Sequence, residues 1–219
     1  MTKLVIFDLD GTLINTIADL AAAANHALAQ RGIPGHSVEE YTKMVGHGVR
    51  NMLTAALERS LHRTPETDLV DAVLSDFTPY YVANIDVHTR PYPGLVELTG
   101  QLALKGIKLA VASNKFQEGA EKLIAEFFPG IDFVAVLGNR EGLPLKPSAD
   151  VVNLILAKAG VAREECLLVG DSATDVKTAK NAGVRCIGVA WGFRPKSDLV
   201  QAGADHIAEN AAELAALIN

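Results

Sequence analysis

Short apolar runs alternate along the chain with segments in which apolar positions recur at helical spacing. The runs are rich in β-branched residues, and their near-continuous apolarity is typical of strands buried on both faces of a parallel sheet. Gly106, Gly160 and Gly183 each follow a helical segment and precede such a run, where glycine commonly ends a helix. The runs lie at residues 4–7, 107–113, 133–138, 166–171 and 185–191, with a weaker one near residue 205. This alternation predicts an α/β fold with helices on both faces of the sheet.

The first two strands are separated by about a hundred residues without a convincing strand, far more than one crossover helix requires. Apolar positions in this stretch follow helical spacing, and Ser37 with Glu40 forms a capping-box pattern. Thr64-Pro65 predicts a further helix start. We therefore expect a Rossmann-like core at residues 1–14 and 91–219, and a small inserted α-helical cap domain at residues 15–90.

The composition is that of a globular protein with a substantial core. Of the 219 residues, 49% are hydrophobic, 21% charged and only 5% aromatic, which favours helix-rich packing over a β-sandwich. Cys166 and Cys186 lie in apolar runs, where buried, reduced thiols are expected. This cysteine usage indicates a cytoplasmic protein.

The short apolar runs and the negative net charge make export, membrane insertion and nucleic-acid binding unexpected. The opening apolar run is broken at once by Asp8 and Asp10, so it is too short for a signal-peptide core, and no run approaches membrane-spanning length. The formal net charge of −6 disfavours binding to nucleic acid or to an anionic membrane surface. A small anionic substrate would therefore need a locally positive pocket or a metal ion.

Two carboxylate pairs follow predicted strands. Asp8 and Asp10 come directly after the first strand, and their like charges are costly unless a cation or a shared proton relieves them. Asp171 ends a later strand, and Asp175 follows it in the segment GDSATD. Oxygen ligands from two strand ends suit Mg²⁺. The alternatives are a turn cluster for the first pair, and for Asp175 either support of the site or a favourable helix-dipole charge.

Two further segments carry groups that could bind an anion. Ser113, Asn114 and Lys115 end a strand and lead into a helix, whose free N–H groups can cradle a phosphate. Lys146 precedes Pro147, which is expected to start the next helix and to stiffen the backbone. A lone lysine is usually a solvated charge, but at the carboxyl edge of a sheet it can neutralise a phosphate and a nucleophile together.

The four segments, taken in their order along the chain, resemble the motifs of the haloacid dehalogenase superfamily of phosphatases across nearly the whole chain. The resemblance implies Asp8 as the nucleophile of an aspartyl-phosphate mechanism and Asp10 as the general acid and base. It also implies a Mg²⁺ site formed by Asp8, Asp171 and the backbone carbonyl of Asp10, with Asp175 supporting it. Ser113, Asn114, Lys146 and the loop residues Gly11 and Thr12 would bind the phosphate, with Thr12 also orienting Asp10.

Within that superfamily, the insertion resembles a substrate-closing cap, and several segments are most similar to phosphoglycolate phosphatases. In MVGHGVRNML, the turn with Gly46 and His47 opens a helix carrying Arg50, whose forked guanidinium suits a substrate carboxylate. Surface roles for His47 and Arg50 stay open. We expect a small phosphorylated metabolite, with 2-phosphoglycolate favoured; no oligomeric state is predicted.

Other activities remain as alternatives. A sugar-phosphate phosphatase or a phosphomutase of the same superfamily is one, although Leu20 stands where mutases usually carry a histidine. A receiver domain shares the acidic pocket but lacks the insertion and the second acid. A non-catalytic phosphate-binding protein is the last. Asn15 stands where many relatives carry an acid, and it could still cap the helix that begins near Thr16.

Overall fold

The computed structural model describes residues 1–218, and the chain folds into two compact units. The core unit contains Met1–Asn15 together with the chain from Pro91 onward, and the inserted unit is Thr16–Arg90. The division lies one residue from the expected boundary. Among the described residues, none of the helices combines the length and the apolar character needed to cross a bilayer.

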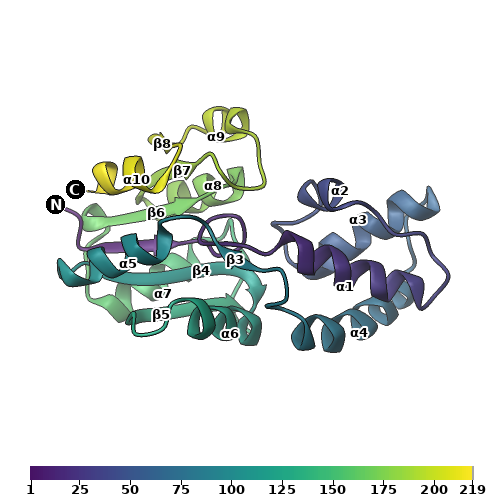
Figure 1. The fold of residues 1–219 in the computed structure, drawn as a ribbon. Coiled ribbons are helices and arrows are strands. Elements are labelled where there is room, and N and C mark those ends of the chain that lie inside the picture. Colours follow the sequence, from purple (N-terminus) through teal and green to yellow (C-terminus); the bar gives the residue numbers. More distant parts are fainter. Residues whose placement is uncertain (219) are drawn as a thin grey trace. The chain divides into compact units, whose positions relative to one another are not determined.

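The core unit is built on a six-stranded parallel sheet with the strand order β5-β4-β1-β6-β7-β8 (Figure 1). Each predicted run forms one of these strands, so the predicted fold class is confirmed. The central strand β1 is buried at all four positions, as its continuous apolar run requires. The strands are β1 (Leu4–Phe7), β4 (Lys108–Phe116), β5 (Phe133–Asn139), β6 (Cys166–Gly170), β7 (Arg185–Val189) and β8 (His206–Ala208).

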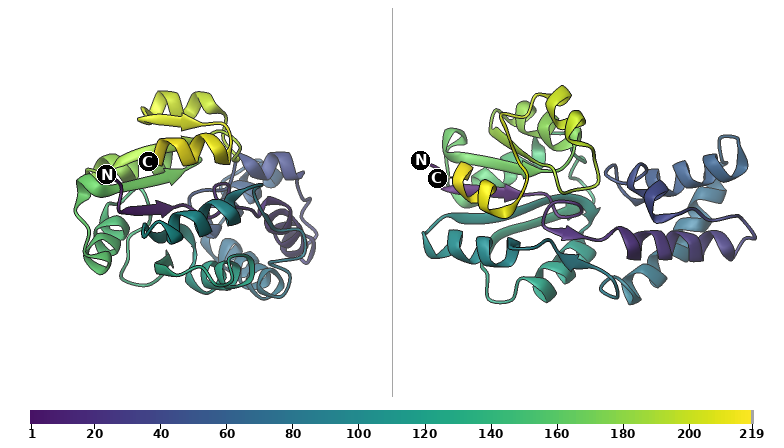
Figure 2. Two further views of the ribbon diagram at one scale, coloured as in Figure 1. Left: turned by 60° about the vertical axis from the view of Figure 1, so that its left-hand side comes forward. Right: turned by 45° about the horizontal axis from the view of Figure 1, so that its top comes forward.

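Helices cover both faces of this sheet, and the layering can be followed in Figure 2. The apolar side chains of α7 and α8 pack with Leu4 and Ile6 on one face, whereas α5 contacts β4 and α10 contacts α5. Gly160 and Gly183 end α7 and α8 in the left-handed conformation, as predicted. The helices are α5 (Leu95–Leu104), α6 (Gln117–Phe127), α7 (Asp150–Ala159), the 3-10 helix η1 (Arg163–Glu165), α8 (Ala173–Ala182), α9 (Lys196–Ala202) and α10 (Ala211–Ile218).

The expected role of Pro147 as a helix start is wrong. Helix α7 begins at Asp150, after Ala149 as its N-cap residue. The intervening Ser148 hydroxyl bonds the side chain of Asp150 and accepts from its backbone N–H, so this short turn separates Pro147 from the helix. Cys166 and Cys186 are both buried free thiols, as expected.

The inserted unit is helical, as predicted, and its helices pack through buried apolar side chains such as Leu28, Leu53 and Phe77. The capping box of Ser37 and Glu40 is present at the start of α2. The helix start predicted at Thr64-Pro65 is wrong, because Glu66 is the N-cap residue of α4 and the helix begins at Thr67. The helices are α1 (Ile17–Ala29), α2 (Val38–Thr42), α3 (Val49–Leu61) and α4 (Thr67–Ala83).

The chain leaves the core and returns to it at one place. Two short strands, β2 (Ile14–Asn15) and β3 (Arg90–Pro91), pair with each other, and the Tyr92 backbone N–H donates to the Leu13 carbonyl at 3.0 Å. Thr16, and not Asn15, is the N-cap residue of α1, and its side chain makes no capping hydrogen bond.

One buried carboxylate ties the start of the inserted unit to its end. Asp19 in α1 accepts hydrogen bonds from the backbone N–H groups of His88 and Thr89 and from the Thr89 hydroxyl, the last two at 2.8 Å. Residues about seventy positions apart are thereby joined.

Candidate active site

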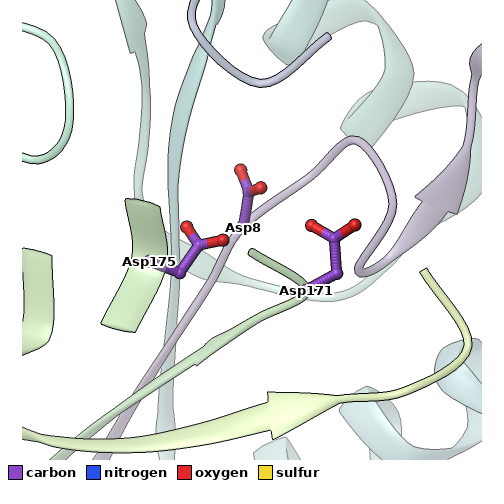
Figure 3. Close-up of side chains that lie close together, drawn as sticks. All are labelled: Asp8, Asp171 and Asp175. Atoms are coloured by element: carbon purple, nitrogen blue, oxygen red, sulfur yellow. The ribbon is translucent and has the colours of Figure 1, made fainter. Parts of the chain in front are cut away.

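Three carboxylates converge at the carboxyl edge of the sheet (Figure 3). Asp8 directly follows β1, Asp171 directly follows β6, and Asp175 lies in the first turn of α8. One ligand atom from each lies within 4.8 Å of the others. Because β1 and β6 are parallel neighbours, their ends bring these loops together. The structure thus assembles acids that are more than 160 residues apart in sequence.

The crowding of these acids makes their ionised forms costly. Burial raises the pKa of Asp8 to about 7, with Asp175 and Asp10 adding to the increase and Lys146 opposing it. Burial, followed by the charges of Asp175 and Asp8, also holds the pKa of Asp171 well above its usual value. A bound cation would relieve this repulsion, and an all-oxygen set of carboxylates suits a hard divalent metal ion. The residues present therefore fit a metal site.

Lys146 supplies positive charge inside the same cluster. Its ammonium lies 2.9 Å from Asp8 Oδ1 and 2.6 Å from Asp175 Oδ1, and its side chain is only 3% exposed. Burial alone would lower the pKa of Lys146, but Asp175 and Asp8 raise it above its usual value. Lys146 is therefore a permanently charged group held against the proposed nucleophile.

Asp175 contacts Lys146 and the start of α8 at the same time. One carboxylate oxygen accepts from Lys146, while the other accepts from the backbone N–H and the hydroxyl of Ser172 at 3.1 and 2.6 Å. Asp175 thereby completes the capping box of α8 and orients the lysine. Its side chain is fully buried.

Ser113 and Asn114 lie at the end of β4, where both are buried. The Asn114 amide exchanges two hydrogen bonds with the backbone of Lys146, at 3.1 and 2.8 Å. Asn114 was predicted to bind substrate, and these contacts give it the further task of holding the loop that carries the lysine. The Ser113 hydroxyl accepts from the Lys115 backbone N–H at 3.2 Å.

Lys115, named above with Ser113 and Asn114 but without a role of its own, lies beside Asp10. Its ammonium lies 3.1 and 3.4 Å from the two carboxylate oxygens of Asp10, and its side chain is 2% exposed. The available signal was alternation, since Lys115 stands two residues after Ser113 in the same strand.

Gly11 and Thr12 complete the first loop. Gly11 has a φ of +92°, and a Cβ there would lie 2.5 Å from Asp171 Oδ2, so only glycine fits. The fully buried Thr12 hydroxyl makes no hydrogen bond within the described residues, so it does not orient Asp10 as expected. Lys115 holds Asp10 instead.

The predicted residues of the insertion lie on its surface. Gly46 and Gly48 both have positive φ, and Gly48 is the N-cap residue of α3, so the expected glycine-flanked turn does open a helix. His47 is exposed. Arg50 forms an ion pair with Asp71 of α4, and both side chains are about half exposed. Their contacts with substrate stay predictions.

Comparison with known proteins agrees with this arrangement. The family described as haloacid dehalogenase-like hydrolase matches residues 5–189. A phosphoglycolate phosphatase of Agrobacterium fabrum is 35% identical over 88% of this chain and 82% of its own. A protein of Lactobacillus delbrueckii subsp. bulgaricus, provisionally named a phosphoglycolate phosphatase, has a TM-score of 0.94 at 36% identity and covers 100% of this chain and 99% of its own.

A third relative was solved with a ligand: CbbY from Rhodobacter sphaeroides, in complex with phosphate. Its TM-score is 0.82 at 27% identity, with 98% of this chain and 96% of that chain covered. The chain belongs to the haloacid dehalogenase-like hydrolases. Within that class it is a phosphatase, and its substrate is a small phosphorylated molecule.

Proposed function

We propose that this phosphatase hydrolyses 2-phosphoglycolate with the help of Mg²⁺, through an aspartyl-phosphate formed on Asp8. The observation that carries the proposal is the buried contact of Lys146 with both Asp8 and Asp175, beside the acid Asp171. This arrangement places one fixed cation among three carboxylates, and phosphoryl transfer depends on such positioned charges.

The metal ion would be held by Asp8, Asp171 and the backbone carbonyl of Asp10. When bound, it would neutralise phosphate charge and keep Asp8 ionised at neutral pH. An Asp8 oxygen would attack phosphorus while the ester oxygen leaves. Lys146, Ser113 and the backbone N–H groups of the first loop would hold the phosphate oxygens during this step.

Asp10 would protonate the leaving oxygen and then remove a proton from the water that hydrolyses the aspartyl-phosphate. Its separation from the Lys146 cluster supports this division of labour, because Asp10 is paired with Lys115 and not with Lys146. Lys115 would keep the Asp10 carboxyl turned toward the leaving group. The two acids thus have different partners for their different tasks.

The choice of 2-phosphoglycolate is supported by the names of the relatives and by the position of Lys115. In this substrate, the carbon that carries the ester oxygen also carries the carboxylate. A leaving oxygen that contacts Asp10 would therefore bring the substrate carboxylate close to Lys115. This cation would offset the charge of the carboxylate, and Arg50 of the insertion would add a second one. We place the enzyme in the cytoplasm, where the free thiols of Cys166 and Cys186 would persist.

The test is a substrate panel measured with Mg²⁺ and again after chelation. Phosphoglycolate should give the highest kcat/KM, above 2-hydroxyethyl phosphate, hexose phosphates and nucleoside monophosphates, and chelation should remove turnover. Acid quenching should trap phosphate on wild-type enzyme but not on Asp8→Asn. A hexose phosphate that exceeds phosphoglycolate would overturn the substrate assignment, and turnover that survives chelation would overturn the Mg²⁺ requirement.

Lys115→Met distinguishes a role of Lys115 toward the substrate carboxylate from its role in holding Asp10. The variant keeps a long, unbranched side chain and removes its charge. It should lose more kcat/KM on phosphoglycolate than on 2-hydroxyethyl phosphate, which has a neutral hydroxymethyl group in place of the carboxylate. An equal loss on both would mean that Lys115 serves only to hold Asp10.

A further inference from the structure

The segment that follows β7 reaches into the site from outside the four motifs. Trp191, Gly192 and Phe193 contact both loops that carry the proposed metal ligands. The indole Nε1 of Trp191 donates to the Thr12 carbonyl at 3.0 Å, in the loop after β1. The backbone N–H of Phe193 donates to Asp171 Oδ2 at 2.8 Å, in the loop after β6.

Gly192 lies between these two contacts, in a space that no side chain can enter. A Cβ there would lie 2.2 Å from Asp171 Cβ, 2.4 Å from Asp171 Oδ2 and 2.5 Å from the Gly11 carbonyl oxygen. One of these is a backbone atom and the other two belong to a short, buried side chain, so no flexible group can move aside. Since a Cβ on Gly11 would also meet Asp171 Oδ2, at 2.5 Å, the carboxylate is bordered by two glycines.

We infer that Trp191, Gly192 and Phe193 form a positioning segment that sets the orientation of the Asp171 carboxylate and thereby the affinity of the site for a divalent cation. The inference rests on the proposed metal site. A hydrogen bond to one oxygen restricts rotation of the carboxylate and leaves the other oxygen for the ion. Partners that orient a ligand in this way typically change metal affinity by ~10–100-fold when removed.

The backbone conformation of Gly192 does not explain why glycine is needed at this position. A glycine needed only for the turn would be explained by a left-handed φ, but Gly192 is not among the residues with positive φ. Its requirement comes from the close approach to Asp171 and Gly11. The tryptophan contact adds a second restraint, because it ties the same segment to the loop that carries Asp8 and Asp10.

The experiment measures metal binding directly, without turnover. Mn²⁺ accepts similar oxygen ligands to Mg²⁺, and its free ion is quantified by electron paramagnetic resonance. Gly192→Ala should raise the Mn²⁺ Kd at least ~10-fold, and Trp191→Phe, which removes the indole donor but keeps an aromatic ring, should raise it ~3-fold. In Gly192→Ala, saturating Mg²⁺ should restore part of kcat.

Gly188→Ala is the matched control. Gly188 lies in β7, the strand that precedes this segment, and a Cβ there would meet only the side chain of Leu199, at 3.0 Å or more. This variant should keep the wild-type Mn²⁺ Kd even if its stability falls. Trp191 is the single tryptophan of the chain, so its fluorescence reports on the same segment during titration of wild-type protein.

A folded Gly192→Ala with the wild-type Mn²⁺ Kd would overturn the inference. If Gly192→Ala does not fold, Trp191→Phe decides, and an unchanged Kd in that variant overturns it equally. Asp171→Asn separates this result from a failure of the proposed function. If Asp171→Asn binds Mn²⁺ as wild type does, the metal site itself is assigned wrongly, whereas weakened binding in Asp171→Asn alone rejects only the positioning segment.

Discussion

The two units each bury a carboxylate to the same extent, yet the two acids have different surroundings. Asp19 in the inserted unit and Asp171 in the core unit are both 3% exposed. Asp19 receives hydrogen bonds from two backbone N–H groups and one hydroxyl. Asp171 receives one from Phe193 and lies within 4.8 Å of two other carboxylates.

This comparison shows that burial of an acid does not by itself mark a functional site. Asp19 is surrounded by neutral hydrogen-bond donors, and its role is to join α1 to the end of the inserted unit. The charge of Asp171 is opposed by its neighbours, and a protein retains such a conflict only where something else resolves it. In this chain, a bound cation and an anionic substrate would resolve it.

The largest expected effect comes from Asp8→Asn, which removes the nucleophile and one of the opposed charges. An amide does not attack phosphorus, so kcat should fall on the order of 10⁴-fold or more, the scale seen when a cooperating catalytic group is lost. The folded structure should persist, because the change relieves repulsion. Turnover and circular dichroism check the two statements, and near-wild-type turnover would reject Asp8 as the nucleophile.

The stability of the metal-free protein should decrease as the pH rises from about 4 to about 7. Burial raises the pKa of Asp8 from 3.8 to about 7, so in this window the native state binds a proton that the unfolded state has released. Stability then falls with pH, by about 1.4 kcal/mol for each unit of pKa difference at most. Denaturant unfolding with chelator measures the slope. Asp8→Asn should flatten it, and an equally steep slope in that variant would assign the effect to other groups.

Asp19→Ala tests whether the buried acid of the inserted unit serves stability and not turnover. Removing this acceptor leaves buried donors without a partner, which should lower the free energy of unfolding by about 3 kcal/mol. Since Asp19 lies outside the carboxylate cluster, kcat should change little well below the melting temperature. Asp68→Ala, an exposed acid in the first turn of α4, is the control and should have almost no effect. A large loss of kcat in folded Asp19→Ala would show that the two acids are not separate in function.

The smallest expected effect concerns Arg50 and tests whether the inserted unit contributes to substrate choice. Arg50→Ala should lower kcat/KM for phosphoglycolate by roughly 1.5–3 kcal/mol, the range for hydrogen bonds to charged groups. Turnover of an aryl phosphate, whose leaving group carries no carboxylate, should change much less. Arg59→Ala is matched, because Arg59 is in the same helix and also forms an exposed ion pair, with Glu40. Equal losses on both substrates would assign Arg50 to the fold or to the chemistry.

The site residues that were predictable from sequence are those that lie at the end of a strand. Asp8, Ser113 and Asp171 follow continuous apolar runs, and parallel strands bring such ends to one edge. The role of Gly192 was not predictable, because it depends on the distance to Asp171 and Gly11 in two other loops. The same holds for Lys115, whose partner Asp10 lies 105 positions away.

Local signals were reliable where both of their hydrogen bonds form. The Ser37 capping box predicted the start of α2 correctly, because both of its hydrogen bonds are local. Thr64-Pro65 predicted the wrong start for α4, whose N-cap residue is Glu66 and makes no side-chain capping hydrogen bond. Without such a bond, a sequence pattern fixes a helix end only to within a few residues.

The hydrogen bond between Leu13 and Tyr92 marks a junction at which the inserted unit could be exchanged for another domain. Because the chain departs and returns within 3.0 Å, the core does not depend on the length of what lies between. The entropy of closing a loop grows only slowly with its length. Residues 16–90 can therefore be treated as an exchangeable module, and grafting another domain, or a short turn, at this junction would leave every strand of the sheet in its register.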